Sequence, residues 1–244
     1  MFADKITEVA FPVDPLFQRL LATPAPFFTP TLDENLPKST YHIYRDGDWV
    51  PFQHTQFYFT VQSDTDDPQT LYTFKAIKPR KRQIRETTFH RVADFTSPCV
   101  RALVAPIQQD RGKPVNAITG RPIDFHTLSS RVIREEPDRL DKPSWGPRRF
   151  TYAGRQFVWE TEKKNHIDPQ TLHEVEKVWP KPGSKTGKKE HKLIGSPICW
   201  GKYACSFKSK IAVIHMVGGL DQVFREYLLA SQLTRLAIVH GQGI

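Results

Sequence analysis

Two clusters of Lys and Arg are the side chains of this chain best suited to bind a ligand, because grouped cations attract phosphate and carboxylate groups. They lie in the segments 78–85 and 181–192, and the whole chain carries a net charge of +9. The cationic residues are Lys78, Arg80, Lys81, Arg82 and Arg85 in the first segment, and Lys185, Lys188 and Lys189 in the second. We predict that these residues form an anion-binding surface. Solvated turns of the same composition are the alternative interpretation.

A surface of this kind has two main classes of partner, anionic lipid headgroups and nucleic acid. The 16 Phe, 7 Tyr and 5 Trp residues could stack on unpaired bases beside the basic segments. In a chain rich in β-strand, however, alternating aromatic residues mostly form the core. We therefore favour anionic lipid, and keep a nucleic-acid-associated or nuclear protein as an alternative.

Cysteine and histidine are the residue types that would indicate metal binding or nucleophilic catalysis. The best zinc candidates are His191, Cys199, Cys205 and His215, but five residues separate the two cysteines. Zinc ligands usually lie roughly two to four residues apart. Cys99 has no base nearby in the sequence. We predict no metal, no cofactor and no catalytic residues, while an enzyme with a non-contiguous active site stays a second alternative.

Two other polar segments resemble ligand loops without meeting their requirements. Gly183 and Gly187 lie too close together for a phosphate-binding loop, and Lys189 stands where such a loop has Ser or Thr. The acidic segment 64–67 lacks the glycine and the further oxygen ligands of a known calcium loop. We predict that both segments are solvated turns.

The elements that must position the basic clusters are mostly β-strands. Apolar and polar residues alternate with a period of two, and tight-turn residues separate several of the alternating segments. We expect Ile211, Val213 and His215 to share the inward face of the last strand. The predicted strands cover 41–44, 49–52, 57–61, 71–77, 84–92, 150–152, 157–159, 172–179 and 203–217.

Two parts of the chain carry no strong strand pattern. The segment 111–146 is rich in Pro, Gly and charge and is expected to be a long loop, with a short strand at 129–134 and exposed residues at 134–139. Residues 1–40 contain six prolines, which exclude a regular helix or a central strand. We predict a Pro-rich arm over 1–40 that packs on the outside of one domain over 41–244.

The final segment predicts a buried helix over about 220–240. Its apolar residues occupy every side of the helical wheel, which is typical of a helix enclosed by other elements. Asp221 is expected to cap its start, and Gly241 to follow its end. Three charged residues argue against complete enclosure, namely Arg225, Glu226 and Arg235. We predict a mainly β fold, an antiparallel β-barrel around this hydrophobic C-terminal α-helix.

The compartment is predicted from absent signals and from the cysteines. The apolar part of the final helix falls short of the roughly 20 residues needed to span a bilayer. The N-terminus lacks a secretory signal pattern, and three cysteines do not make a disulfide framework. These features favour the cytoplasm or the nucleus, with peripheral membrane contact and no transmembrane segment, and leave the oligomeric state open.

Antiparallel strands that end in Gly218, Gly219, Leu220 and Asp221 and a hydrophobic C-terminal helix resemble the tubby C-terminal-like barrel superfamily. That superfamily includes tubby domains, phospholipid scramblases, plant LURP-one-related proteins and fungal tubby-like proteins. The resemblance is architectural, covers about 41–240, and rests on the segments 157–159, 211–217 and 220–239. It implies a link to phosphoinositides, which tubby domains bind through basic surface residues. We therefore expect a non-enzymatic intracellular module that contacts anionic membrane lipid.

Overall fold

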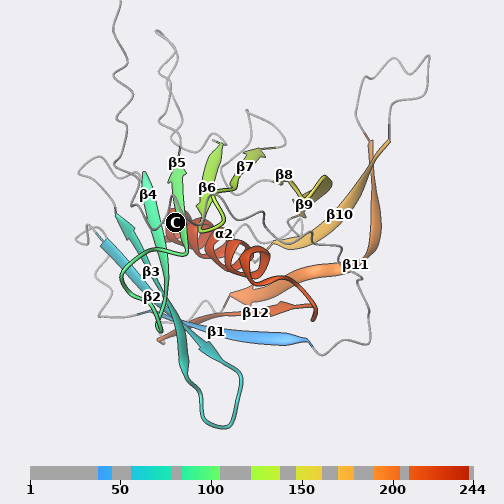
Figure 1. Ribbon diagram of the computed structural model, residues 1–244. Helices are drawn as coiled ribbons and strands as arrows, with labels where there is room; N and C mark the ends of the chain where they lie inside the picture. Colours follow the sequence, from blue (N-terminus) through green and yellow to red (C-terminus); the bar gives the residue numbers. More distant parts are fainter. Residues whose placement is uncertain are drawn as a thin grey trace, which may run out of the picture.

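The fold is a closed antiparallel β-barrel with a helix, α2, running through it (Figure 1). The computed structural model describes residues 38–45, 56–77, 84–104, 122–137, 147–160, 170–178, 190–203 and 209–241. The elements are β1 (Ser39–Arg45), β2 (Gln56–Ser63), β3 (Thr70–Ile77), β4 (Glu86–Arg91), β5 (Val100–Val104), β6 (Ile123–Thr127), β7 (Val132–Pro137), β8 (Arg148–Tyr152), β9 (Arg155–Glu160), β10 (Thr171–Val178), β11 (Glu190–Tyr203), β12 (Lys210–Met216) and α2 (Gln222–Gly241). This architecture confirms the predicted mainly β barrel around a C-terminal helix.

The barrel has the simplest connectivity, because each strand pairs with the next one along the chain and β12 pairs with β1 to close it. The closing register aligns Ser39 with Met216. Successive connections therefore alternate between the two ends of the barrel. We call the end where β1 begins and β12 ends the entry end. α2 starts there, since only a short turn separates it from Met216.

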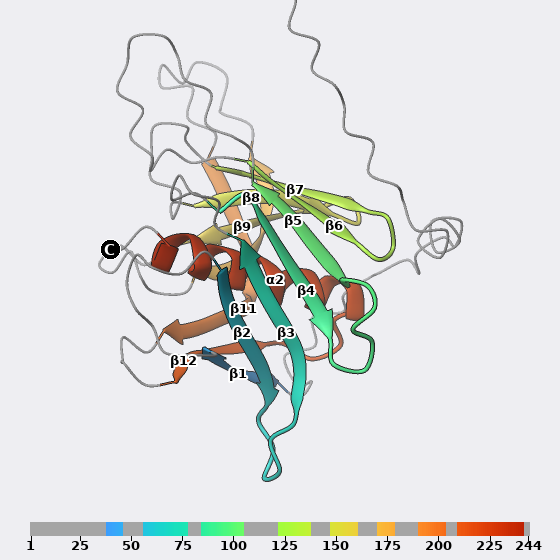
Figure 2. The same ribbon diagram turned by 90° about the vertical axis from the view of Figure 1, so that its left-hand side faces the viewer.

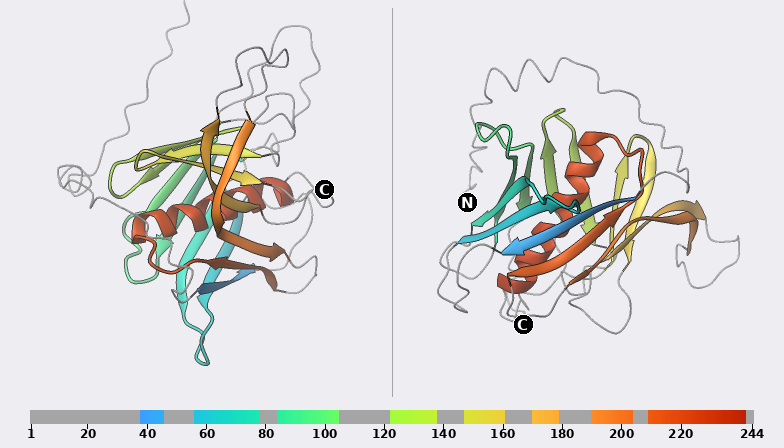
Figure 3. Two further views of the ribbon diagram at one scale, coloured as in Figure 1. Left: turned by 90° about the vertical axis from the view of Figure 1, so that its right-hand side faces the viewer. Right: turned by 90° about the horizontal axis from the view of Figure 1, so that it is seen from below.

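The strands are buried on one face because alternate side chains point at α2. In β6, for example, Ile123, Phe125 and Thr127 are buried, whereas the two residues between them are half-buried. Figures 2 and 3 show the strands wrapping around the helix from every side except its ends. Burial of a large apolar side chain contributes roughly 1.5–3 kcal/mol, so this inward face supplies most of the stabilisation.

The helix is enclosed along most of its length. Asp221 caps its start, with its Oδ1 accepting a hydrogen bond of 2.8 Å from the Phe224 amide. Glu226 and Arg235 are buried despite their charge. Glu226 accepts hydrogen bonds from Arg91 at 2.6 and 2.9 Å, which offsets the cost of burying its carboxylate. In the described part of the chain, no helix is both long enough and apolar enough to cross a bilayer.

Several predicted strands are confirmed. The segments 57–61, 71–77, 84–92, 150–152, 157–159 and 172–179 fall largely within β2, β3, β4, β8, β9 and β10. Ala153 and Gly154 join β8 to β9 with φ values of 48° and 78°. Positive φ at both turn residues matches the twist of the flanking strands, which explains the tight hairpin there.

The predicted long loop over 111–146 is wrong in part, because β6 lies within it, whereas the short strand expected at 129–134 overlaps β7. The expectation that 134–139 is exposed is also wrong for Glu135, which is only 1% exposed. Strands of five or six residues hold too few alternations to stand out from a segment rich in Pro and charge. The side chain of Glu135 points inward because Ile133, two residues earlier, is on the same face.

The predicted strand over 203–217 is wrong as one element, since β11 ends at Tyr203 and β12 begins at Lys210. Ile211 and Ala212 are both buried, because the pairing of β12 with β1 shifts at this point. The shift moves every later side chain to the other face. His215 therefore lies on the outer face rather than inside the barrel as predicted.

Other expectations lie outside the described residues. They concern the strand at 49–52, Cys205, His191's side chain, and the arm apart from its last residues.

Candidate functional site

The barrel interior holds a buried carboxylate as well as apolar side chains. Glu135 on β7 accepts hydrogen bonds through Oε1 from Tyr227 at 2.6 Å, from Trp159 at 3.3 Å and from Ser231. Its Oε2 forms an ion pair of 3.2 Å with Arg148 on β8. Every polar bond of the carboxylate thus comes from a strand or from α2, so the group fixes the helix in the barrel.

The interior groups are unsuited to catalysis because burial suppresses their ionised forms. Desolvation, reinforced by the nearby Glu135 carboxylate, raises the pKa of the Tyr227 hydroxyl well above its usual range. Desolvation also raises the pKa of the Cys99 and Cys199 thiols, and a buried neutral thiol is a poor nucleophile. The described interior therefore has a structural role.

On the outer face, His42 of β1 donates a 2.7 Å hydrogen bond from its Nε2 to Asp64 Oδ1. This bond lowers the pKa of the Asp64 carboxyl. A His–Asp pair of this kind activates a nucleophile only when a hydroxyl or thiol meets the other ring nitrogen. Among the described residues, no side chain hydrogen-bonds His42 Nδ1. The pair is better explained as a tie between β1 and the β2–β3 turn.

A second outer cluster lies next to this pair. His215 stacks on Trp200 with ring centroids 5.6 Å apart, and its Nδ1 is 3.0 Å from the Thr40 hydroxyl. The Lys38 ammonium lies over the Trp200 ring, with its Nζ 5.4 Å from the ring centroid. Partial burial lowers the pKa of His215. These contacts tie β11, β12 and β1 together on the outer face of the barrel.

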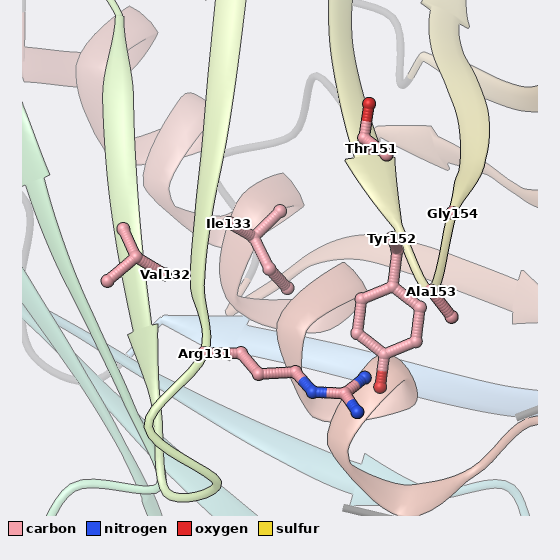
Figure 4. Close-up of a pocket in the computed structure, with 7 residues that line it drawn as sticks. All are labelled: Arg131, Val132, Ile133, Thr151, Tyr152, Ala153 and Gly154. Atoms are coloured by element: carbon pink, nitrogen blue, oxygen red, sulfur yellow. The ribbon is translucent and has the colours of Figure 1, made fainter. Parts of the chain in front are cut away.

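The barrel wall opens between β7 and β8. Among the described residues, the ladder joining the two strands contains only the pairs Glu136↔Arg149 and Pro137↔Arg148. Beyond these pairs the strands diverge towards the entry end and enclose a cavity of about 490 Å³ (Figure 4). The lining residues are Arg131, Val132, Ile133, Thr151, Tyr152, Ala153 and Gly154. A volume of this size falls within the range of small ligand or peptide sites.

The wide end of this cleft is closed by side chains rather than by backbone pairing. The Arg131 guanidinium lies 5.6 Å from the ring centroid of Tyr152, and Figure 4 shows it pointing at that ring. The Tyr152 hydroxyl donates to Asp221 at 3.2 and 3.3 Å, which ties β8 to the helix cap. Burial and the Asp221 carboxylate raise the pKa of Tyr152. Arg131 therefore presents a positive charge at the mouth of the cleft.

Of the predicted anion-binding residues, Arg85 lies in the described part of the chain. It is exposed just before β4, and its carbonyl accepts a 2.9 Å hydrogen bond from the Val104 amide. The other predicted residues, Lys78, Arg80, Lys81, Arg82, Lys185, Lys188 and Lys189, lie outside the described residues. The structure describes only the strands that flank these residues.

The flanking strands of the two basic segments end on the same side of the molecule. Ile77 pairs with Glu86 at the β3–β4 end, and Val178 pairs with Glu190 at the β10–β11 end. Strand direction alone would assign these connections to opposite ends of the barrel. The register of β10 and β11 shifts, however, and Gly195 has a φ of 63° there. In Figures 1 and 2 the bent β10–β11 hairpin points upward, as does the start of β4.

In the described ranges, no three His, Cys, Asp or Glu side chains converge in a way that could hold a metal ion. Of the predicted zinc candidates, Cys199 is buried in the core and His215 lies on the outer face. The structure therefore does not bring these two residues together at a common site.

The fold and its surface define a class, a closed antiparallel barrel filled by its C-terminal helix, with basic connections and an open cleft in its wall. Comparison with known proteins found no matching family model, no matching curated protein and no matching solved structure.

Proposed function

We propose that this protein is a non-enzymatic binding module that contacts anionic membrane lipid, of the phosphoinositide type, through its two basic segments. The residues involved are Lys78, Arg80, Lys81, Arg82 and Arg85 in one segment and Lys185, Lys188 and Lys189 in the other. The observation that supports the proposal is the common direction of the strands that flank these segments.

Two further features support a surface function. The interior is occupied by α2, whose residues from Tyr227 to Ala237 are at most 5% exposed, so the described barrel encloses a packed helix rather than a ligand. The net charge of +9 favours an anionic partner. A membrane presents many headgroups in one plane, which suits two basic segments whose flanking strands point the same way.

The resemblance to tubby-like barrels supports the same proposal at the level of architecture. A twelve-stranded antiparallel barrel around a C-terminal helix is the arrangement that the resemblance implies. The phosphoinositide link comes from the resemblance alone, and therefore belongs to the proposal.

The test is a charge reversal in the first segment. Changing Arg80, Lys81 and Arg82 to Glu moves the net charge from +9 to +3, since three positive charges are lost and three negative charges gained (9 − 6 = 3). A basic residue near an anionic membrane contributes about 1 kcal/mol, so binding to vesicles with polyphosphoinositide should weaken roughly a hundredfold. Vesicle sedimentation gives the affinity, and the melting midpoint should stay near that of the parent.

A matched control carries the same charge change on another face. Lys38 directly precedes β1, Lys202 lies on β11 and Lys210 begins β12, and these three strands are neighbours in the barrel. The change of these three residues to Glu also gives +3. This control should retain most of the vesicle binding. Equal losses in both variants would show that only total charge matters. Stronger binding to short DNA or RNA than to vesicles would favour the nucleic-acid alternative instead.

A further inference from the structure

The cleft between β7 and β8 lies where the ladder of the barrel wall stops. In an antiparallel pair, alternate residues direct their backbone N–H and C=O groups to opposite neighbours. The Thr127 amide donates to the Arg131 carbonyl at 3.1 Å, which assigns Arg131 and Ile133 to the β6 side of β7. The backbone groups of Val132 between them therefore face β8. In the described part of the chain, the β7–β8 ladder gives Val132 no partner.

The opposite wall of the cleft is built in the same way. The turn between β8 and β9 closes on the pair Tyr152↔Arg155, so the backbone of Tyr152 bonds towards β9. The backbone groups of Thr151 therefore face β7, across the cleft. A small number of backbone N–H and C=O groups on the walls of a pocket is typical of sites that orient a small ligand.

Between these walls the cleft is mostly apolar. Val132 and Ile133 line one side, and Ala153, Gly154 and the ring of Tyr152 line the other (Figure 4). Val132 is 55% exposed, so a ligand in the cleft would remove apolar surface from water. The volume of about 490 Å³ has room for a ring system or a short aliphatic chain.

Arg131 is the one charged residue among the described residues that line the cleft. Its guanidinium contacts Tyr152, at 5.6 Å from the ring centroid and through the hydroxyl. Asp221 accepts hydrogen bonds from that same hydroxyl and from the Phe224 amide. Within the described ranges no carboxylate forms an ion pair with Arg131 itself. The guanidinium can therefore bind an anionic group of a ligand without breaking an existing ion pair.

The neighbouring arginines on the two strands are engaged elsewhere. Arg134 contacts Asp124 at 3.9 Å and Glu136 at 3.4 Å, and Arg149 also has a partner. A ligand in the cleft thus meets the single charge of Arg131. A monoanion balances that charge, whereas a phosphate monoester carries about −1.5 to −2 at neutral pH and would keep part of its charge unpaired. A carboxylate also matches the planar guanidinium with two parallel hydrogen bonds.

We propose that the cleft between β7 and β8 binds a small monocarboxylate with an apolar body. The carboxylate pairs with the Arg131 guanidinium at the mouth, and the apolar body lies between Val132 and Ala153. The backbone groups of Val132 and Thr151 hydrogen-bond polar substituents of the ligand. The inference goes beyond the proposed membrane function and does not depend on it, because no residue of the two basic segments takes part.

The test uses the full chain and three naphthalene probes in isothermal titration calorimetry. The probe 2-naphthoate carries the carboxylate, 2-naphthamide is its uncharged isostere, and 2-naphthyl phosphate carries the larger charge. We expect one equivalent of 2-naphthoate to bind at least about tenfold more tightly than either of the other probes. A hydrogen bond to a charged group contributes roughly this factor.

Two arginine variants with the same charge change locate the site. Arg131→Gln should weaken the binding of 2-naphthoate by about tenfold or more, and should keep the binding of 2-naphthamide within about twofold of the parent. Arg134→Gln, on the same strand but outside the lining, should bind both probes as the parent does. In amide NMR spectra 2-naphthoate should shift the signals of Val132 and Thr151, whereas the signal of Phe59 in β2 should stay in place.

Three results would overturn the proposal. The first is no binding of 2-naphthoate at millimolar concentration. The second is equal binding by the parent and Arg131→Gln, or equal losses in the two arginine variants. The third is tighter binding of 2-naphthyl phosphate, which would assign the cleft to a phosphate ligand instead. Vesicle binding through the basic segments does not enter these titrations, so the two proposals fail separately.

Discussion

Glu135 gives the sharpest test of how the helix is held. Its carboxylate is 1% exposed, accepts three hydrogen bonds and pairs with Arg148. Replacing Glu135 with Leu removes the partner of a cation that is itself buried, and breaking such a pair costs about 3–5 kcal/mol. In a chain of this size each kcal/mol shifts the melting midpoint by roughly 2–4 °C. We therefore expect a fall of roughly 6–20 °C, measured by thermal circular dichroism.

Two companion variants make the result interpretable. Glu136→Leu changes the next residue of the same strand, which is exposed and pairs with Arg134 only at 3.4 Å. It should cost less than about 0.5 kcal/mol. Combining Glu135→Leu with Arg148→Met leaves no unbalanced buried charge. The loss in free energy of unfolding in the double variant should therefore be smaller, by about 2 kcal/mol, than the losses of the two single variants added together.

The outcome that would refute this reasoning is specific. If Glu135→Leu melts like Glu136→Leu, the buried carboxylate is not what holds α2 in place. If the costs of Glu135→Leu and Arg148→Met simply add, the two side chains act independently, and the ion pair has no energetic role.

Three further predictions concern packing and pH. Leu228→Lys should prevent folding, since Leu228 is 0% exposed and a buried unpaired charge with lost packing costs more than roughly 3 kcal/mol, as loss of the cooperative melt would show. Gly201→Ala should destabilise by roughly 1–3 kcal/mol in urea unfolding, because the added Cβ would lie 2.3 Å from the Val213 carbonyl oxygen. Burial lowers the pKa of His90 and His126 below 6.5, so the unfolded chain binds protons first and stability should fall as pH drops below that value. An unchanged urea midpoint from neutral to mildly acidic pH would contradict the last expectation.

The final helix could be predicted because its evidence is local. Apolar residues on every side of the wheel indicate enclosure whatever surrounds the segment. Asp221 then caps it as expected, and Glu226, one of the charged residues that argued against enclosure, is satisfied by a distant partner. This partner, Arg91, is 135 residues from Glu226 in the sequence. No local pattern indicates such a partner, which is why the sequence left complete enclosure open.

Short strands and their faces were harder to predict for a physical reason. Glu135 resembles an exposed residue because its neighbours along the chain are charged, yet its surroundings are set by Trp159 and by Tyr227 and Ser231 of α2. His215 was assigned to the wrong face because a single register shift near Ala212 reverses the alternation. Both errors come from pairing between strands, which a pattern along one strand does not contain.

The two candidate sites, the basic segments and the β7–β8 cleft, also differ in how far the sequence could predict them. The basic segments are visible in the sequence because charge needs no partner to be recognised, but the side on which each lies depends on the bend of the β10–β11 hairpin. The cleft has no sequence signal of its own, since it consists of backbone groups that β8 fails to meet. What could have indicated it is the weak strand pattern around 132–137, because a strand that pairs fully on both edges usually shows a stronger one. Among the described residues, the cleft thus arises where β7 and β8 diverge beyond their two pairs, a property of two strands together that neither strand shows alone.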